Sequence, residues 1–123
     1  MNTKQRDHWM GRQGDVVLTT HVYNSNDELV PVGQPSVEAA TAKPDPQLGV
    51  VLQAGRVTGH HHHMPGAGVA MTREPDGARN IEVANEEPLE HDEHHTIVVP
   101  AGLMAVGIQV EHVPGAVARQ VED

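Results

Sequence analysis

Histidine is the residue type in this chain whose number and spacing could do chemistry. Ten of the 123 residues are histidine, and seven of these lie in two clusters, the run His60–His63 and the segment His91-Asp92-Glu93-His94-His95. Neutral imidazole is a common ligand of zinc and related divalent transition metals, and carboxylates either ligate beside it or orient it through hydrogen bonds. Each cluster is therefore a candidate half of a metal site.

The first cluster follows a segment with strand character. Side chains on a strand alternate between its two faces. His60 and His62 are then expected on one face, and His61 and His63 on the other. Two imidazoles that are two residues apart on one face can converge on a single ion.

The second cluster allows two arrangements. On a helical turn, His91 pairs with His94 or with His95. On an extended strand, His91, Glu93 and His95 share a face instead. In both arrangements three donors point the same way, and two histidines from each cluster would complete a four-coordinate site.

These patterns predict a mainly structural site for a divalent transition metal. Zinc is the first candidate, with nickel, iron or manganese as alternatives. His8 and His21 are expected to be ordinary surface or strand residues, and His112 is either a further ligand or a residue at the rim. The predicted ligands are His60, His62, His91, His94, His95 and Glu93.

Composition excludes several other functions. The chain has no cysteine, which removes disulfides, thiolate metal ligands and thiol catalysis. A net charge of −9 with dispersed basic residues argues against nucleic-acid binding. No apolar stretch approaches the 18 residues of a membrane span, and the first residues lack a secretory signal, so we expect a cytoplasmic protein. The spacing in the second cluster is not His-Glu-x-x-His, and no serine lies in a nucleophile elbow, which favours a binding role over an enzymatic one.

The elements that must position these residues are strands. Valine occurs eighteen times and phenylalanine not at all, and β-branched side chains favour strands. A hairpin is expected over residues 69–84, because Glu74-Pro75-Asp76-Gly77 has the composition of a turn. Helix is expected for a single turn at most, with 86–95 as the best candidate. The predicted fold is one all-β domain, a small β-barrel or β-sandwich of six to nine short antiparallel strands.

The domain organisation is expected to be simple. Residues 1–13 are polar and predict an extended or mobile N-terminal arm. Residues 14–123 form the single β domain. Within it, the segment 31–47 carries four prolines and predicts a loop or an edge strand, because proline cannot donate a hydrogen bond to a sheet.

Four segments occur in an order that matches a known set of motifs. They are Arg12-Gln13-Gly14-Asp15-Val16-Val17-Leu18, Gly55-Arg56-Val57-Thr58-Gly59-His60-His61-His62, Leu89-Glu90-His91-Asp92-Glu93-His94 and the segment from Val99 to Gln109. In this order they resemble a family of small uncharacterised bacterial and phage proteins. Its motifs are Arg-Gln-Gly-Asp-(Val/Ile)-Leu-Leu, Gly-Glu-Val-Thr-Gly-His-x-His, Leu-x-His-x-Glu-His and Leu-Pro-Pro-Gly-x-Tyr-x-Val-x-x-Gln.

The resemblance departs from the motifs at Arg56, where the family has an acidic residue, and at Met104, where it has tyrosine. It implies that His60, His62, His91 and His94 form the paired set. It also implies a phage or prophage source, in which small β proteins serve as virion components.

Three function classes follow. The first is a metal-binding β module. The second is a virion, capsid-decorating or assembly protein, which would work as a homo-oligomer or in a larger protein assembly. The third is a cupin-like metal-dependent enzyme. The clusters also allow plainer interpretations, as solvated surface histidines or as imidazoles that gain charge near pH 6.5.

Overall fold

The chain is an all-β protein, as its valine-rich composition predicts. The computed structural model describes residues 7–54, 60–111 and 119–120, and these form strands, turns and loops without a helix. Accordingly, none of the described segments is a helix that could cross a membrane. The strands are β1 (Met10–Gln13), β2 (Val16–Thr19), β3 (His21–Tyr23), β4 (Leu29–Pro31), β5 (Ala40–Thr41), β6 (Val50–Gln53), β7 (His62–Met64), β8 (Val69–Arg73), β9 (Arg79–Val83), β10 (Glu87–Leu89), β11 (Ile97–Val99), β12 (Gly102–Ile108), β13 (Val110–Glu111) and β14 (Arg119–Gln120).

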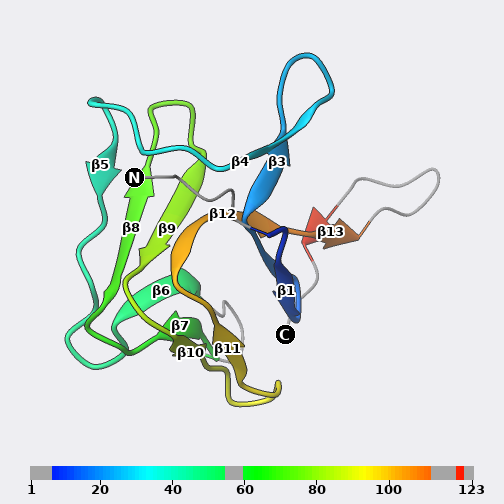
Figure 1. Cartoon of the computed structure of the whole chain (residues 1–123). Helices are drawn as coiled ribbons and strands as arrows, with labels where there is room; N and C mark the ends of the chain where they lie inside the picture. The colour runs from blue at the N-terminus through cyan, green and yellow to red at the C-terminus, as the bar shows by residue number, and fades with distance from the viewer. Residues whose placement is uncertain (1–6, 55–59, 112–118, 121–123) are drawn as a thin grey trace.

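A six-stranded antiparallel sheet is the main element of the fold (Figure 1). Its strand order is β1-β2-β12-β9-β8-β5, so β1 and β5 are its two edges and the described residues do not close it into a ring. Four further antiparallel pairs accompany it: β3 with β4, β6 with β7, β10 with β11, and β13 with β14. In Figure 1 the strands β6, β7, β10 and β11 lie together in the lower part of the molecule.

Two tight turns set the register of this sheet. The predicted hairpin over 69–84 is confirmed as β8–β9, and Gly77 at its turn has a φ of +95°, which favours glycine. A second hairpin joins β1 to β2 through two residues, because Gln13 pairs with Val16. Gly14 has a φ of +58° at the first central position, as in a type II′ turn.

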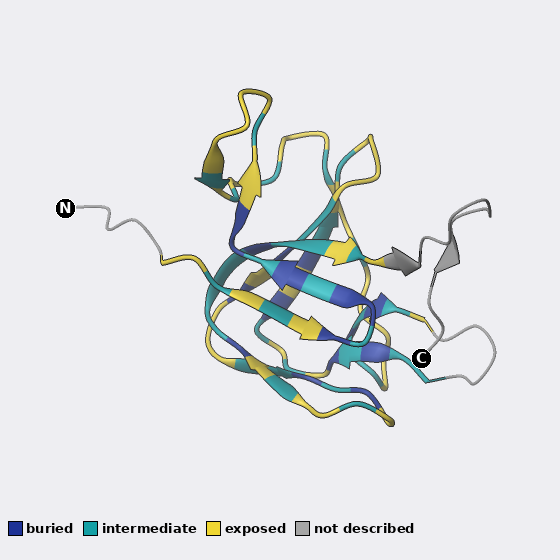
Figure 2. Ribbon diagram, turned by 90° about the vertical axis from the view of Figure 1, so that its right-hand side faces the viewer, coloured by how far each residue is buried: buried dark blue, intermediate teal, exposed yellow. Residues whose placement is uncertain are grey.

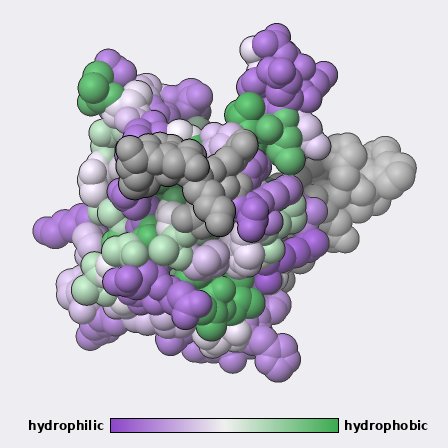
Figure 3. Space-filling view, in the orientation of Figure 1, coloured by the Kyte–Doolittle hydropathy of each residue, from purple (hydrophilic) through white to green (hydrophobic). Residues whose placement is uncertain are grey.

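The hydrophobic core of the described residues is built from aliphatic and methionine side chains. Valine, leucine, isoleucine and methionine from most of the strands fill it (Figure 2). Each such side chain contributes about 1.5–3 kcal/mol when it is fully buried. On the face shown in Figure 3, hydrophobic residues form separate patches among hydrophilic ones. The fully buried hydrophobic side chains are Val16, Leu18, Met64, Leu89, Val99 and Met104 at 0% exposure, with Leu52 and Ile81 at 1%.

The structure corrects two expectations about local structure. Residues 86–95 do not form a helical turn: they contain strand β10 followed by bends. Proline at position 88 explains this, because the residue before a proline is disfavoured in the helical conformation. The described residues also form fourteen strands, more than the six to nine expected; β2 and β3 are separated at Thr20, and β12 and β13 at Gln109.

The expected arm and tail fall partly outside the described residues. Of the arm, residues 1–6 lie outside, while Met10–Gln13 form the edge strand β1. His112 and residues 113–118 of the expected tail also lie outside. Within the proline-rich segment 31–47, the strand β5 pairs with β8 at the second edge of the sheet.

Candidate metal centre

A backbone bridge between β7 and the end of β10 brings the two histidine clusters side by side. The N–H of His63 donates to the carbonyl of Glu90 at 3.0 Å, and the N–H of Glu90 donates to the carbonyl of His63 at 2.8 Å. The residues next to these two, His62 and His91, are therefore neighbours. Their ring centroids lie 4.2 Å apart.

Three imidazoles from the two clusters share one small space. His62, His91 and His94 each offer a ring nitrogen, and these three nitrogens lie within 4.8 Å of one another. The His91 and His94 rings are 4.6 Å apart and the His62 and His94 rings 5.7 Å apart. His62 and His91 are buried and His94 is half-buried, so the space is reached from the His94 side.

The orientation of His62 is fixed by Gln13 at the end of β1. The Gln13 side-chain amide donates through Nε2 to the carbonyls of Leu89 at 2.8 Å and His95 at 2.9 Å. Its Oε1 is therefore the acceptor that faces His62 Nδ1 at 2.9 Å, and that nitrogen carries a hydrogen. The remaining nitrogen, Nε2, is the one available to a metal, and hydrogen bonding of this kind is how proteins hold a ligating histidine.

Asp15 lies on the buried side of the same imidazole. Its Oδ1 is 3.7 Å from His62 Nε2, and its Oδ2 accepts a hydrogen bond from Gln53 Nε2 at 3.1 Å. The residue is 1% exposed. The hairpin turn between β1 and β2 thus places two polar side chains, Gln13 and Asp15, against one histidine.

His91 has a local hydrogen bond that metal binding would change. Its Nδ1 accepts the backbone N–H of Glu93 at 3.0 Å. Ligation through Nδ1 replaces this bond, and ligation through Nε2 places a hydrogen on Nδ1 and also removes it. The backbone at residues 91–93 is therefore expected to shift if an ion binds His91.

The other predicted ligands lie beside this group or away from it. His60 Nδ1 is 3.2 Å from Glu93 Oε1, and the His60 ring is 5.8 Å from that of His91, so both residues lie at the edge of the group. His95 is exposed, and its contact with the site is its backbone carbonyl, which accepts from Gln13.

His61 and His63 are on the opposite side of their strand. His63 Nδ1 is 2.9 Å from the carbonyl of Leu48, in the loop before β6. Asp45 in that loop accepts the backbone N–H groups of Gln47 and Leu48, and these two bonds, aided by the nearby charges of His61 and His63, lower the pKa of Asp45. His61 and His63 therefore lie on the side of the turn at residues 45–48 and are not part of the three-histidine group.

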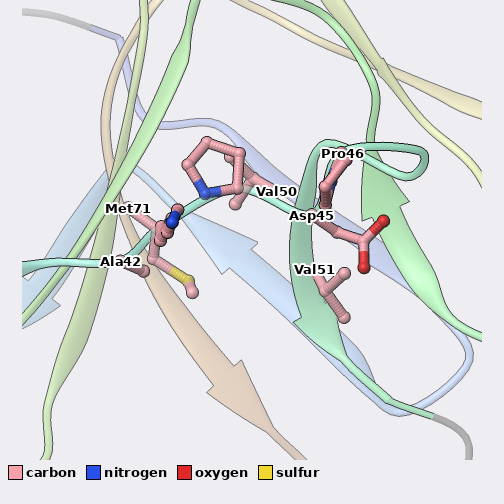
Figure 4. A pocket seen from close by; sticks show the side chains of 8 residues that line it. Ala42, Asp45, Pro46, Val50, Val51 and Met71 are labelled. Carbon is pink, nitrogen blue, oxygen red and sulfur yellow. The ribbon is translucent and has the colours of Figure 1, made fainter.

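A pocket next to this loop contains none of these histidines. It has a volume of about 530 Å³ and lies between the 42–46 loop, β6 and β8. Figure 4 shows Ala42 and Met71 on one side, and Asp45, Pro46 and Val51 of β6 on the other. Its lining is mostly apolar, and it is separate from the three-histidine group.

Sequence reasoning missed Gln13 and Asp15 as members of the site. Both belong to the motif Arg12-Gln13-Gly14-Asp15, which contributes to the family resemblance but predicts no role for either residue in the site. The signal that could have found them is a polar side chain just before a two-residue hairpin turn and a second one within it. Neither residue is near the two histidine clusters in the sequence, since 49 positions separate Gln13 from His62.

Fold and site together define an antiparallel β domain with a three-histidine group at the junction of two strand pairs. The chain belongs to the family described as Domain of unknown function (DUF8820), whose sequence profile matches residues 12–109. That range contains Gln13, Asp15 and all three histidines of the group. No curated protein and no solved structure gives a significant match to the chain.

Proposed function

We propose that this protein is a metal-binding β module whose ligands are His62, His91 and His94. The ion is a divalent transition metal, with zinc as the first candidate. The observation that carries the proposal is the convergence of three imidazole nitrogens within 4.8 Å, on rings of which His62 is held by Gln13 through Nδ1. Zinc binds histidine nitrogens at about 2.0–2.1 Å, so a small closure of the group would satisfy it.

Burial supports a metal over a cluster of solvated histidines. Exposed imidazoles gain nothing from being placed together, and each is satisfied by water. Here His62 is 1% exposed and His91 is 6% exposed. Polar rings are costly to bury unless their nitrogens are bound, and a shared cation would bind one nitrogen of each of the three rings at once.

The location supports a structural role for the ion. The ligands come from β7 and from the bends after β10, and His62 is in turn bonded to the β1–β2 hairpin. An ion at this junction would join three parts of the chain that are distant in sequence. Because it binds the folded state, it stabilises that state by about 2.7 kcal/mol at a free concentration of 100 times its Kd.

Metal content tests the proposal directly. The protein is expressed without a tag, purified without a nickel resin and analysed by mass spectrometry. About one equivalent of metal is expected in the wild type, and none in His62→Ala/His91→Ala. The matched control is His61→Ala/His95→Ala, which also removes one histidine from each cluster and should keep the metal.

Folding is controlled by a third variant, His94→Ala, which changes the half-buried ligand. Circular dichroism should show that it folds like the wild type, with less metal bound. Chelation should lower the Tm of the wild type and leave that of His62→Ala/His91→Ala unchanged. A wild type that holds no metal after reconstitution, or a double variant that holds as much as the wild type, contradicts the proposal.

A further inference from the structure

Two arginines lie opposite each other at the turn end of the β8–β9 hairpin. Arg73 pairs with Arg79 in the register, so both side chains are on the same face of the sheet. Like charges in directly opposite positions repel and destabilise a strand pair. Burial of Arg79 and the charge of Arg73 both lower the pKa of the Arg79 guanidinium, which still stays charged at neutral pH. The hairpin therefore holds two positive charges close together on one face.

No carboxylate of the described residues forms an ion pair with these two arginines. The ion pairs within the described part of the chain all contain a histidine. Glu74, which directly follows Arg73, is bonded instead to the backbone N–H and the hydroxyl of Ser36. Arg79 Nη1 donates to a neutral acceptor, the carbonyl of Leu52, at 2.6 Å. The pair is therefore available to an anion from outside the chain.

The apolar pocket beside the 42–46 loop begins one residue pair further along the same face. Met71 is two residues before Arg73, so its side chain is on the face that carries both arginines. Met71 lines this pocket of about 530 Å³, and its Sδ lies 4.0 Å from Arg79 Nη1. Leu52, whose carbonyl accepts from the same nitrogen, directly follows Val51 of the pocket wall. The arginines are thus at one end of the pocket.

The pocket itself suits an apolar group. Apart from Lys43 and Asp45 its lining residues are apolar, and its volume is in the range of about 300–1,000 Å³ that is usual for small organic ligands. The Asp45 carboxylate accepts two backbone N–H groups of its own turn and points away from Met71 in Figure 4. Lys43 adds a positive charge to the wall. The walls therefore fit an apolar body, and the positive groups fit an anionic head.

We propose that this pocket, with Arg73 and Arg79 at its end, binds a small amphipathic anion. The ligand has an apolar chain or ring, which the pocket holds, and a carboxylate or phosphate head, which the two guanidiniums bind. Planar guanidinium groups bind both kinds of head through paired hydrogen bonds. A bound anion would also relieve the repulsion between the arginines. This site is separate from the three-histidine group and does not depend on a bound metal.

Calorimetric titration with decanoate and with decyl phosphate, each below its critical micelle concentration, tests this proposal. At least one of them should bind, and the tighter of the two identifies the preferred head group. Decanol has the same chain without a charge and should bind about 10-fold more weakly, which is the loss expected for one hydrogen bond between charged groups.

Three variants then locate the site. Arg73→Gln changes an exposed side chain, so it should fold like the wild type and bind the preferred amphiphile about 10-fold more weakly. Arg12→Gln, at an exposed arginine on β1, is the matched control and should keep the wild-type affinity. Ala42→Phe fills the pocket from its wall and should abolish binding without changing the circular dichroism.

Several outcomes overturn the proposal. Neither amphiphile binds, or decanol binds as tightly as they do. Arg73→Gln or Ala42→Phe keeps the wild-type affinity, or Arg12→Gln loses as much affinity as Arg73→Gln does. In each of these cases metal binding by the three histidines still stands, because the two sites share no residue.

Discussion

Replacing Gln13 by alanine is expected to weaken both the fold and the site. The side chain is 2% exposed and makes three hydrogen bonds, to the carbonyls of Leu89 and His95 and to Nδ1 of His62. Each hydrogen bond contributes about 1 kcal/mol net, and the variant leaves its partners without the amide. The metal-free protein should therefore lose about 3 kcal/mol of its free energy of unfolding.

The second effect of Gln13→Ala concerns the metal. Without the amide, Nδ1 of His62 loses its hydrogen-bond partner Gln13 Oε1, so the tautomer and orientation of the ring are no longer fixed by it. Loss of a residue that orients a ligand typically costs 10- to 100-fold in metal affinity. The Kd for zinc should rise by that factor while the stoichiometry stays at one ion.

Two measurements check these magnitudes. Urea denaturation in the presence of a chelator gives the free energy of unfolding, and competition with a chromophoric chelator gives the Kd. Gln34→Ala is the control, because this glutamine is exposed and its loss should change the free energy by less than about 0.5 kcal/mol. If Gln13→Ala cannot be distinguished from Gln34→Ala in either assay, the role assigned to the Gln13 amide is refuted.

Three further predictions concern parts of the fold away from the site. Met64→Ala should lower the free energy of unfolding by about 2–5 kcal/mol in urea denaturation, because the side chain is fully buried. Met10→Ala is the control and should lower it little, because 61% of that residue is exposed. Equal losses in the two variants would contradict the assigned core. Gly77→Ala should lower the free energy of unfolding by about 1 kcal/mol, because φ is +95°. The loss should come from backbone strain alone, since a Cβ at this position would meet nothing within 4 Å. A stabilised variant would exclude the assigned turn. The lowered pKa of Asp45 means that its hydrogen bonds stabilise the fold above the ordinary pKa of 3.8, and that this contribution is lost as pH falls through the lower folded value. The stability gap between wild type and Asp45→Ala, measured from pH 7 to pH 2, should be constant above about pH 5 and close at the acid end.

Local features were predictable from the sequence because neighbouring residues determine them. Valine-rich runs predicted strands, and the Pro75-Asp76-Gly77 turn predicted the β8–β9 hairpin, which the register confirms. The alternation of side chains on a strand placed His62 apart from His61 and His63. The prediction of a helical turn over residues 86–95 was wrong. It gave more weight to the pattern of glutamate and histidine than to Pro88, whose effect on the preceding residue is also local.

The composition of the site was less predictable because it depends on long-range register. The contact of Gln13 with His62 requires β1 to lie beside the end of β7, and no local pattern encodes that. The same is true of the choice among histidines in the second cluster. His94 rather than His95 faces the group because the chain bends after His91, where a backbone N–H bonds to the imidazole.

The spread of the site along the chain has a consequence for how the protein folds. Gln13, His62 and His91 belong to segments that come together only when strands far apart in sequence have paired. Contacts of such long separation form late in folding, and proteins rich in them fold slowly, on the scale of milliseconds to seconds. An ion bound there would stabilise the native state but not the transition state for folding, in which the site has not yet formed. It would therefore leave the folding rate nearly unchanged and slow unfolding. For this fold, the metal would determine how long the native state lasts rather than how quickly it is reached.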